Sequence, residues 1–232
     1  MGRPPRRAAD DEIYHVLNRA SGAQQIFATP DDYAAFERVL VAAHDKVEMR
    51  TLAYCVMPNH WHLVLWPRRG GDLSRFVGWL SLTHTQRWHA HRGTAGSGHL
   101  YQGRFKSFPV QNDGHFLAVC RYVERNALRA GLAGRAEDWR WSSLWRRTSG
   151  GAAEAAWLSA WPLPEPADWC AWVNQPQSAE EVEALRRCVA RGRPYGDTAW
   201  TASAADRLGL ASTLSPRGRP KKGVRNLFQE IS

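Results

Sequence analysis

Residues 49–66 read MRTLAYCVMPNHWHLVLW, and the predicted fold is built around this segment. Two β-prone runs, 49–57 and 60–66, flank the pair Pro58-Asn59, which is typical of a turn. The stretch therefore predicts a β-hairpin. Because side chains alternate between the two faces of a strand, His60 and His62 are expected on one face and the residue between them on the other.

The sequence on both sides of this hairpin predicts further strands and helices. They predict a strand over 13–17, a helix that Thr29-Pro30-Asp31-Asp32 begins, a helix from Asp72 to Gly93, a strand over 104–110 and a helix from Asp113. The resulting order is β-α-β-β-α-β-α. It predicts an α+β fold of the ferredoxin-like or RRM-like kind, an antiparallel sheet with helices on one side, plus a C-terminal extension.

The length and composition fit one globular core with additions. The chain has 232 residues, of which 44% are hydrophobic and 23% charged, values that exclude wholesale disorder or a rod. We expect a basic leader (1–12), a catalytic domain (13–147), an extension (148–214) whose clearest element is a helix over 178–190, and a flexible basic tail (215–232). The four cysteines lack zinc-site or redox spacing, which favours free thiols.

The charge distribution points to a polyanionic partner. Lys and Arg outnumber Asp and Glu by 31 to 22, a net charge of +9, and residues 1–150 hold 21 of the basic and 13 of the acidic groups. No apolar run approaches the length of about 18 residues that a membrane span needs, and no apolar signal core follows the start. We therefore expect a cytoplasmic protein, associated with the nucleoid and not with a membrane.

The strongest chemical pattern is the pair His60 and His62, which would supply half of a metal site. Two histidines on a solvated sheet face are the alternative interpretation. A second pair, His89 and His91, falls in a predicted helix, where side chains two residues apart diverge by about 200°. Only the first pair can converge on one ion.

Tyr122 and Asn126 form a second pattern, because residues four apart leave the same face of a helix. A metal-polarised electrophile would ease attack by the tyrosine, and the amide oxygen could complete the metal shell. The alternative is a tyrosine that simply packs against the sheet.

Basic and aromatic residues make a third pattern. Alternation places Arg104 and Lys106 on one face of their strand, where they suit phosphates. The tryptophans of 139–141 could stack on bases or fill the core, and we expect most tryptophans in the core. The tail centred on Arg217 and Arg219, with Lys221 and Lys222, resembles an AT-hook, although basic tails also occur as solubilising segments.

Several rare strings occur here in one order: YHV at 14–16, MPNHWHLV at 57–64, GHLYQGRFKS at 98–107, RYVERN at 121–126, RAGL at 129–132 and WRWSS at 139–143. This succession resembles the REP-associated tyrosine transposases, which are single-tyrosine HUH enzymes of the IS200-like family. The resemblance covers about residues 13–147.

The resemblance implies a metal-dependent endonuclease and strand transferase that acts on single-stranded DNA. Tyr122 would be the nucleophile, and His60, His62 and Asn126 would hold Mg²⁺ or Mn²⁺. Attack would give a 5′-phosphotyrosine link and a free 3′-hydroxyl. The substrate would be a REP-type DNA hairpin, and the protein a monomer. The expected DNA contacts are Arg19, Arg104, Lys106, Arg129, Arg217, Arg219, Lys221 and Lys222.

The chain departs from the family at one point. The family commonly has proline after the asparagine, whereas Ala127 follows here, so the helix is expected to continue by a residue or two. Two other functions stay open. The first is a regulatory protein that binds DNA hairpins without cleaving them. The second is RNA binding on an RRM-like sheet, although the aromatic-rich RNP string is missing.

Overall fold

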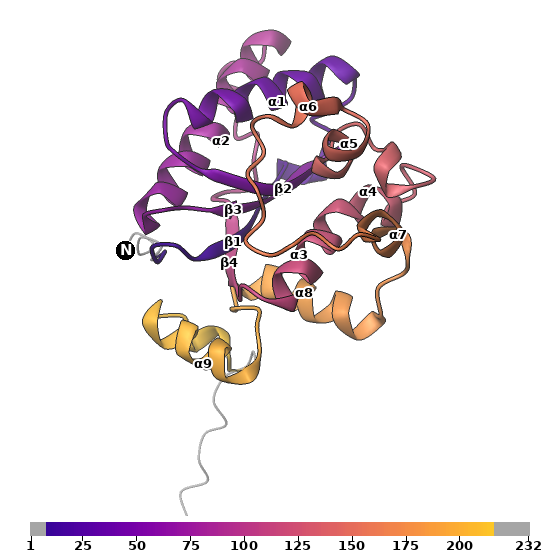
Figure 1. The fold of residues 1–232 in the computed structure, drawn as a ribbon. Coiled ribbons are helices and arrows are strands. Elements are labelled where there is room, and N and C mark those ends of the chain that lie inside the picture. The colour runs from indigo at the N-terminus through magenta and orange to yellow at the C-terminus, as the bar shows by residue number, and fades with distance from the viewer. Residues whose placement is uncertain (1–7, 216–232) are drawn as a thin grey trace, which may run out of the picture.

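A computed structural model describes residues 8–215 of the chain, so the tail residues Arg217, Arg219, Lys221 and Lys222 lie outside the described residues. The core elements follow the predicted order (Figure 1): β1 (Ile13–Arg19), α1 (Pro30–His44), β2 (Arg50–Met57), β3 (His60–Trp66), α2 (Gly70–Arg92), β4 (Lys106–Val110) and α3 (Gly114–Glu124). A 3₁₀ turn, η1 (Ser21–Ala23), follows β1.

The strands form one antiparallel sheet in the order β2-β3-β1-β4. Its β-α-β-β-α-β succession is the ferredoxin-like arrangement, which confirms the predicted fold class. The predicted hairpin is β2–β3, in which Met57 pairs with His60 across the Pro58-Asn59 turn. Strand β4 is two residues shorter than predicted and begins at Lys106.

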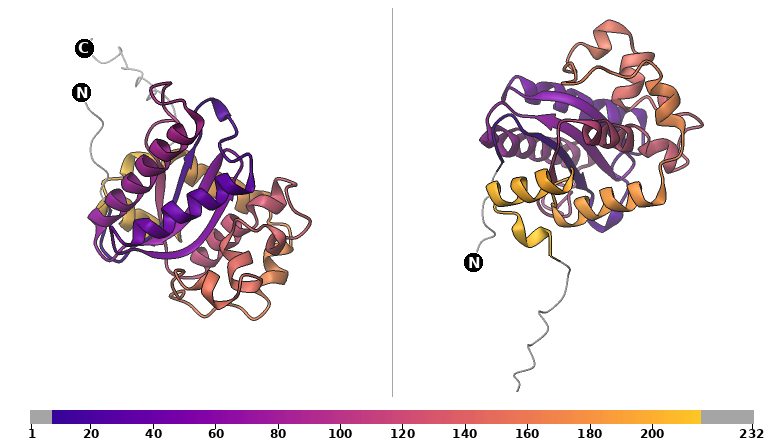
Figure 2. Two further views of the ribbon diagram at one scale, coloured as in Figure 1. Left: turned by 90° about the horizontal axis from the view of Figure 1, so that it is seen from above. Right: turned by 60° about the horizontal axis from the view of Figure 1, so that its bottom comes forward.

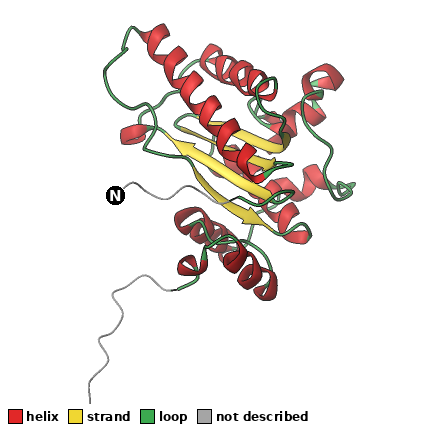
Figure 3. Cartoon of the chain, turned by 90° about the vertical axis from the view of Figure 1, so that its left-hand side faces the viewer, coloured by secondary structure: helices red, strands yellow, loops and turns green. Residues whose placement is uncertain are grey.

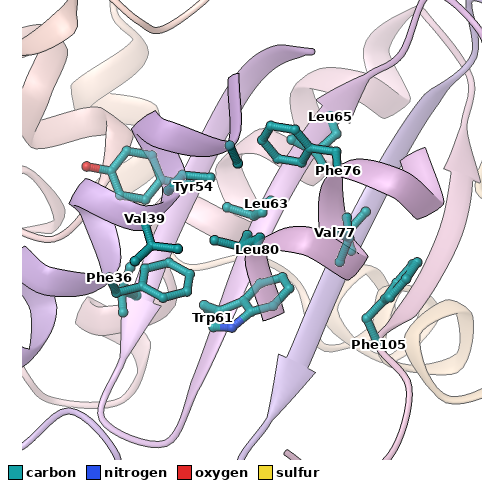
Figure 4. Close-up of a cluster of buried hydrophobic side chains, with 14 of the residues drawn as sticks. Phe36, Val39, Tyr54, Trp61, Leu63, Leu65, Phe76, Val77, Leu80 and Phe105 are labelled. Carbon is teal, nitrogen blue, oxygen red and sulfur yellow. The ribbon is translucent and has the colours of Figure 1, made fainter. Parts of the chain in front are cut away.

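Helices α1 and α2 cover one face of the sheet, as predicted. Figure 4 shows Phe36 and Val39 of α1, Phe76 and Leu80 of α2 and Trp61 of β3 gathered there. The opposite face, however, is also covered, because α3 packs on it together with helices of the extension (Figure 3). The expectation of helices on one side is corrected accordingly: both faces of β1 and β3 are apolar enough to need cover.

The local signals explain where the helices begin and end. Thr29 and Asp32 form a capping box at α1, with Pro30 in the first turn. Helix α2 begins at Gly70, two residues before the predicted Asp72, because Asp10 of the leader accepts a hydrogen bond from the Gly70 amide at 2.7 Å. A Cβ at Gly70 would lie 1.7 Å from the backbone oxygen of Ala8, so this close approach requires glycine.

The missing proline predicts one helix that continues past Asn126, but α3 ends at Glu124 and a separate helical turn follows. Asp113 caps α3 by accepting from the His115 amide, and after an interruption at Arg125 the turn α4 (Asn126–Arg129) follows. The Arg129 amide donates to the carbonyl of Arg125 at 2.9 Å.

The extension contains more helix than the sequence suggested. Two short elements, η2 (Ala136–Asp138) and α5 (Ser143–Thr148), close the preceding domain. The extension comprises α6 (Gly151–Ala155), α7 (Trp169–Asn174), α8 (Ala179–Arg191), α9 (Thr198–Arg207) and η3 (Ala211–Thr213). Only α8 was expected beyond residue 148. Its bounds match the prediction, with Ser178 as the N-cap and Gly192 in the left-handed conformation at the C-cap. Figure 2 shows α8 and α9 lying along one side of the sheet.

The extension belongs to the core and is not an appended module. Trp169, Val173, Leu185 and Cys188 are buried with residues of α3 and the sheet. The short segment around Tyr195 also pairs with the free edge of β4, since the Tyr195 amide donates to the Pro109 carbonyl at 2.9 Å. All four cysteines are free thiols, as expected. No helix of residues 8–215 is long and apolar enough to cross a membrane.

Candidate active site

The β2–β3 hairpin and strand β1 place two histidines beside one another on the face that α3 covers. His60 and His62 have ring centroids 4.9 Å apart. In the antiparallel register, Arg19 lies opposite His60 and Leu17 opposite His62, so these β1 side chains share the face of the histidines. The predicted convergence of His60 and His62 is therefore present in the fold.

Helix α3 brings Tyr122 to the same place. The Tyr122 ring stands edge-on to His62, with centroids 6.0 Å apart, and edge-on to His15 at 6.2 Å. The tyrosine is 7% exposed. Residues 60 positions apart in the sequence thus meet because α3 packs directly on β2 and β3.

A cavity of about 300 Å³ opens between these groups. It contains six of the predicted site residues, together with others that the sequence did not indicate: Leu17, Asn18, Arg19, His60, His62, Gln102, Arg104, Lys106, Tyr122 and Val189. Three of them are cations and none is an acid, so the cavity suits an anionic ligand such as a phosphodiester. A second cavity of about 360 Å³ shares Arg104, Lys106 and Val189 with the first and extends towards Arg191 of the extension.

Burial keeps His60 and His62, the two predicted metal ligands, neutral at physiological pH. Burial lowers the pKa of His60 to about 4, and the guanidinium groups of Arg19 and Arg129 act in the same direction. Burial also lowers the pKa of His62 well below its ordinary value. Neutral imidazoles keep a lone pair, which a metal ligand requires.

Asn126 and Arg129 form a pair beside the nucleophile. The Arg129 guanidinium lies 4.2 Å from the centre of the Tyr122 ring and donates to the Asn126 amide oxygen at 2.9 Å. Asn126 is buried but does not line the cavity, and its Nδ2 has no hydrogen-bond partner. The fold thus brings His60 and His62 together, whereas the oxygen of the third predicted ligand is engaged by Arg129.

The donor set fits a divalent cation in part. The two imidazoles and an amide oxygen are acceptable ligands, and the nitrogen pair favours Mn²⁺ over the harder Mg²⁺. Asn126 does not line the cavity in this arrangement, where its oxygen accepts from Arg129, so it can join the two imidazoles only if its side chain turns towards them. Among residues 8–215, no group of three His, Cys, Asp or Glu side chains forms an alternative metal site.

The other predicted groups have ordinary structural roles. His89 lies near the C-terminal end of α2 and contacts the Thr94 hydroxyl at 2.8 Å, away from the cavity, as the helical spacing implied. Trp139 and Trp141 pack against the core, where Trp141 stacks on Tyr33 with centroids 5.0 Å apart. They are therefore core residues in this structure.

Sequence reasoning missed four residues that line the cavity, Leu17, Asn18, Gln102 and Val189, and also His15, which contacts His62. His15 could have been predicted at the site, because side chains two residues apart on a strand share a face and His15 therefore lies on the face of Leu17 and Arg19. Val189 could not, because it enters from the extension.

Comparisons with known proteins agree with this geometry. The sequence model of the family described as "Transposase IS200 like" matches residues 9–126, just over half of the chain, a stretch that contains His60, His62, Tyr122 and Asn126. No curated protein matches the chain. Among solved structures, it is similar to a REP-associated tyrosine transposase bound to a REP hairpin, with a TM-score of 0.54, 14% identity, and coverage of 77% of this chain and 93% of that one.

A second solved structure, of a putative transposase from Deinococcus radiodurans, has a TM-score of 0.37 and 18% identity, with coverage of 53% of this chain and 95% of that one. Only the first of the two structures is similar enough to show a shared fold.

Proposed function

We propose that this chain, which belongs to the family of IS200-like transposases, is a metal-dependent nuclease and strand transferase for single-stranded DNA. The observation that carries the proposal is the meeting of Tyr122 with His60 and His62 in one cavity lined by cations. A nucleophile, two neutral metal ligands and a phosphate-binding wall are the groups that such a reaction needs.

In the proposed step, the Tyr122 hydroxyl oxygen attacks the scissile phosphorus. A phosphorus–oxygen bond to the tyrosine forms, the bond to the 3′ oxygen breaks, and the tyrosine proton is lost while the 3′ oxygen gains one. The product is a 5′-phosphotyrosine link and a free 3′-hydroxyl, and the reverse step rejoins the strand. The bond energy is conserved in the link, so no nucleotide cofactor is required.

The side chains around Tyr122 support this step. The Arg129 guanidinium lies over the Tyr122 ring, and its Nη1 is buried without a hydrogen-bond partner. A phosphate oxygen bound beside the ring would pair with this group. Arg19, Arg104 and Lys106 would hold the flanking phosphates. A divalent cation on His60, His62 and Asn126 would polarise the scissile phosphate when bound.

A hairpin-forming single strand is the proposed substrate. The solved transposase of the same fold is bound to a REP hairpin. In this chain, the two adjoining cavities offer a path from Tyr122 along the edge strand β4 to Arg191. A single DNA strand that leaves a hairpin would follow that path, with its phosphates against the basic residues that line the two cavities.

We further propose that the protein acts as a monomer in the cytoplasm, on chromosomal DNA. Tyr122 faces the histidines of its own chain, so one copy contains a complete set of reacting groups.

The test is covalent attachment to DNA. Wild-type protein and Tyr122→Phe are incubated with labelled hairpin oligonucleotides from the same genome, with Mn²⁺, Mg²⁺ or EDTA, and resolved on denaturing gels. We expect a metal-dependent covalent band that Tyr122→Phe abolishes while hairpin binding stays within a few-fold. Tyr195→Phe, outside the cavity, is the matched control. A covalent band that persists in Tyr122→Phe would refute the assignment.

One observation favours a second function, a hairpin-binding regulator that does not cleave. The Asn126 oxygen is held by Arg129, and a site that kept this arrangement would lack its third ligand. In that case, His60→Ala with His62→Ala would bind hairpins like the wild type, and the wild type would form no covalent band with any metal.

A further inference from the structure

His15 is a third histidine at the site, and it lies behind His62. It is fully buried in β1, and its Nε2 is 2.8 Å from Nδ1 of His62. Its ring packs against Phe108, with centroids 4.8 Å apart, and against the edge of Tyr122. Neither the family motif of paired histidines nor the charge pattern indicates a role for this residue.

The contact between two neutral imidazoles has a direction, because only one of the two nitrogens can carry the hydrogen. If Nδ1 of His62 donates, its Nε2 keeps a lone pair for a ligand. If Nε2 of His15 donates, His62 must carry its hydrogen on Nε2, and neither of its nitrogens can bind a cation. The His15 contact therefore decides whether His62 is a ligand.

The tautomer of His60 is set by a separate contact. Its Nδ1 lies 2.6 Å from Oδ1 of Asn59, and the Asn59 amide nitrogen donates to the Ala23 carbonyl at 3.3 Å. That bond orients the amide with its oxygen towards His60, so Asn59 accepts and His60 carries its hydrogen on Nδ1. His60 thus presents Nε2 as a free acceptor.

The surroundings of His15 set the cost of this arrangement. Its Nδ1 is buried and has no hydrogen-bond partner. When Nε2 of His15 accepts from His62, Nδ1 carries the hydrogen of the neutral ring, and a buried N–H without an acceptor is destabilising. A cation bound at Nε2 of His62 requires this direction, so metal binding would offset that cost.

We propose that His15 is a positioning residue that holds His62 in the Nδ1–H tautomer and so presents the His62 Nε2 lone pair to a divalent cation. The role is that of the hydrogen-bonded group behind a metal ligand, which fixes the orientation and tautomer of the imidazole. The inference rests on the proposed function, since it assigns the cation to the His60 and His62 pair.

The first test needs no metal and no DNA. Full-length protein with ¹⁵N-labelled histidine is studied by long-range proton–nitrogen NMR at neutral pH, where the nitrogen shifts report the tautomer of each ring. In the wild type, we expect His62 to carry its hydrogen on Nδ1. In His15→Met, which removes the acceptor and keeps an apolar side chain of similar length, the hydrogen is expected to move to Nε2. His15→Gln, whose amide oxygen can accept in place of Nε2, should restore the wild-type tautomer.

The second test measures Mn²⁺ affinity by calorimetry on the same proteins. We expect His15→Met to weaken binding by about ten-fold to a hundred-fold, and His15→Gln to recover most of the loss. His84→Met is the matched control, because His84 is equally buried on the other face of the sheet. It should leave the Mn²⁺ affinity unchanged.

Two results would overturn the inference: a wild-type His62 with its hydrogen on Nε2, or a His15→Met protein that binds Mn²⁺ as the wild type does. If His15→Met does not fold, the wild-type tautomer still decides. Failure of the proposed function would look different. A protein that shows the expected tautomers but forms no covalent adduct with DNA would support the role of His15 and contradict only the cleavage reaction.

Discussion

The two faces of the sheet differ in what covers them and in what they leave unfilled. On one face, α1 and α2 close over a continuous apolar cluster that includes Trp61, Leu63 and Leu65 of β3. On the other face, α3 and the extension cover the neighbouring residues of the same strand, but the histidines and Tyr122 border a cavity. One strand therefore serves packing and chemistry at alternate positions.

The two faces therefore have different roles. The closed face is packed for stability, and the open face carries the groups proposed to react. The polar groups at the centre of the closed face bond to one another: Trp61 donates to the Tyr101 hydroxyl at 2.9 Å, and that oxygen is 2.7 Å from Nδ1 of His84. On the open face, His15, Asn126 and Arg129 each retain a buried atom without a partner. Unsatisfied buried groups are costly, and those of Asn126 and Arg129 lie beside Tyr122, where the proposed substrate would bind.

The sharpest test of this separation uses two adjacent residues. Trp61→Ala should lower the free energy of unfolding by about 3 to 5 kcal/mol, because removal of a fully buried side chain leaves a cavity. His62→Ala should change stability much less but reduce covalent attachment by at least about 100-fold, as removal of a metal ligand predicts. Urea unfolding and the gel assay measure the two effects. Equal loss of stability in both variants would contradict the division of roles.

A second test concerns how the extension holds the catalytic face. Glu124, two residues after Tyr122, is fully buried and accepts from the Trp169 indole at 2.7 Å and from the Ser143 hydroxyl. Trp169→Phe keeps an aromatic ring but leaves the carboxyl without one donor, which should cost up to about 3 kcal/mol in urea unfolding. Trp172→Phe is a control in the same helix. If both variants unfold alike, α7 does not anchor α3 through this bond.

These two tests also mark what the sequence could predict. The alternation of side chains in β3 and the order of the elements were enough to predict the fold. They were also enough to predict that His60 and His62 lie on the same face. The site needed more, because His15 meets His62 only through the register of β1 on β3. Trp169 comes from α7, a short helix that has no side-chain cap and is held by tertiary contacts. Val189 lies in the predicted α8, but its place at the cavity depends on how that helix packs on the sheet. The Arg129 contact with Asn126 depends on side-chain conformations that spacing does not determine.

A third prediction concerns acid stability on the closed face. Burial lowers the pKa of His84 to about 4. Between about pH 6.5 and 4 the unfolded chain therefore binds a proton that the folded chain does not, and stability falls as pH falls, by about 1.4 kcal/mol per pH unit. His84→Asn keeps an acceptor for the Tyr101 hydroxyl and cannot be protonated, so its unfolding free energy should depend less on pH in this window. An unchanged pH dependence would show that other groups control acid unfolding.

The smallest expected effect separates the basic wall of the cavity from basic residues elsewhere. Lys106 is exposed and lines both cavities, whereas Lys46 is exposed beyond the end of α1 and lines neither. Neutralising one cation that binds a phosphate of single-stranded DNA lowers the slope of log affinity against log salt by about 0.7. Lys106→Gln should therefore reduce the slope by about that amount, and Lys46→Gln, which removes the same charge, should leave it unchanged. Titrations of a fluorescent hairpin across a range of salt concentrations measure both slopes. Equal slopes for the two variants would mean that the affinity comes from net charge and not from a strand held along β4.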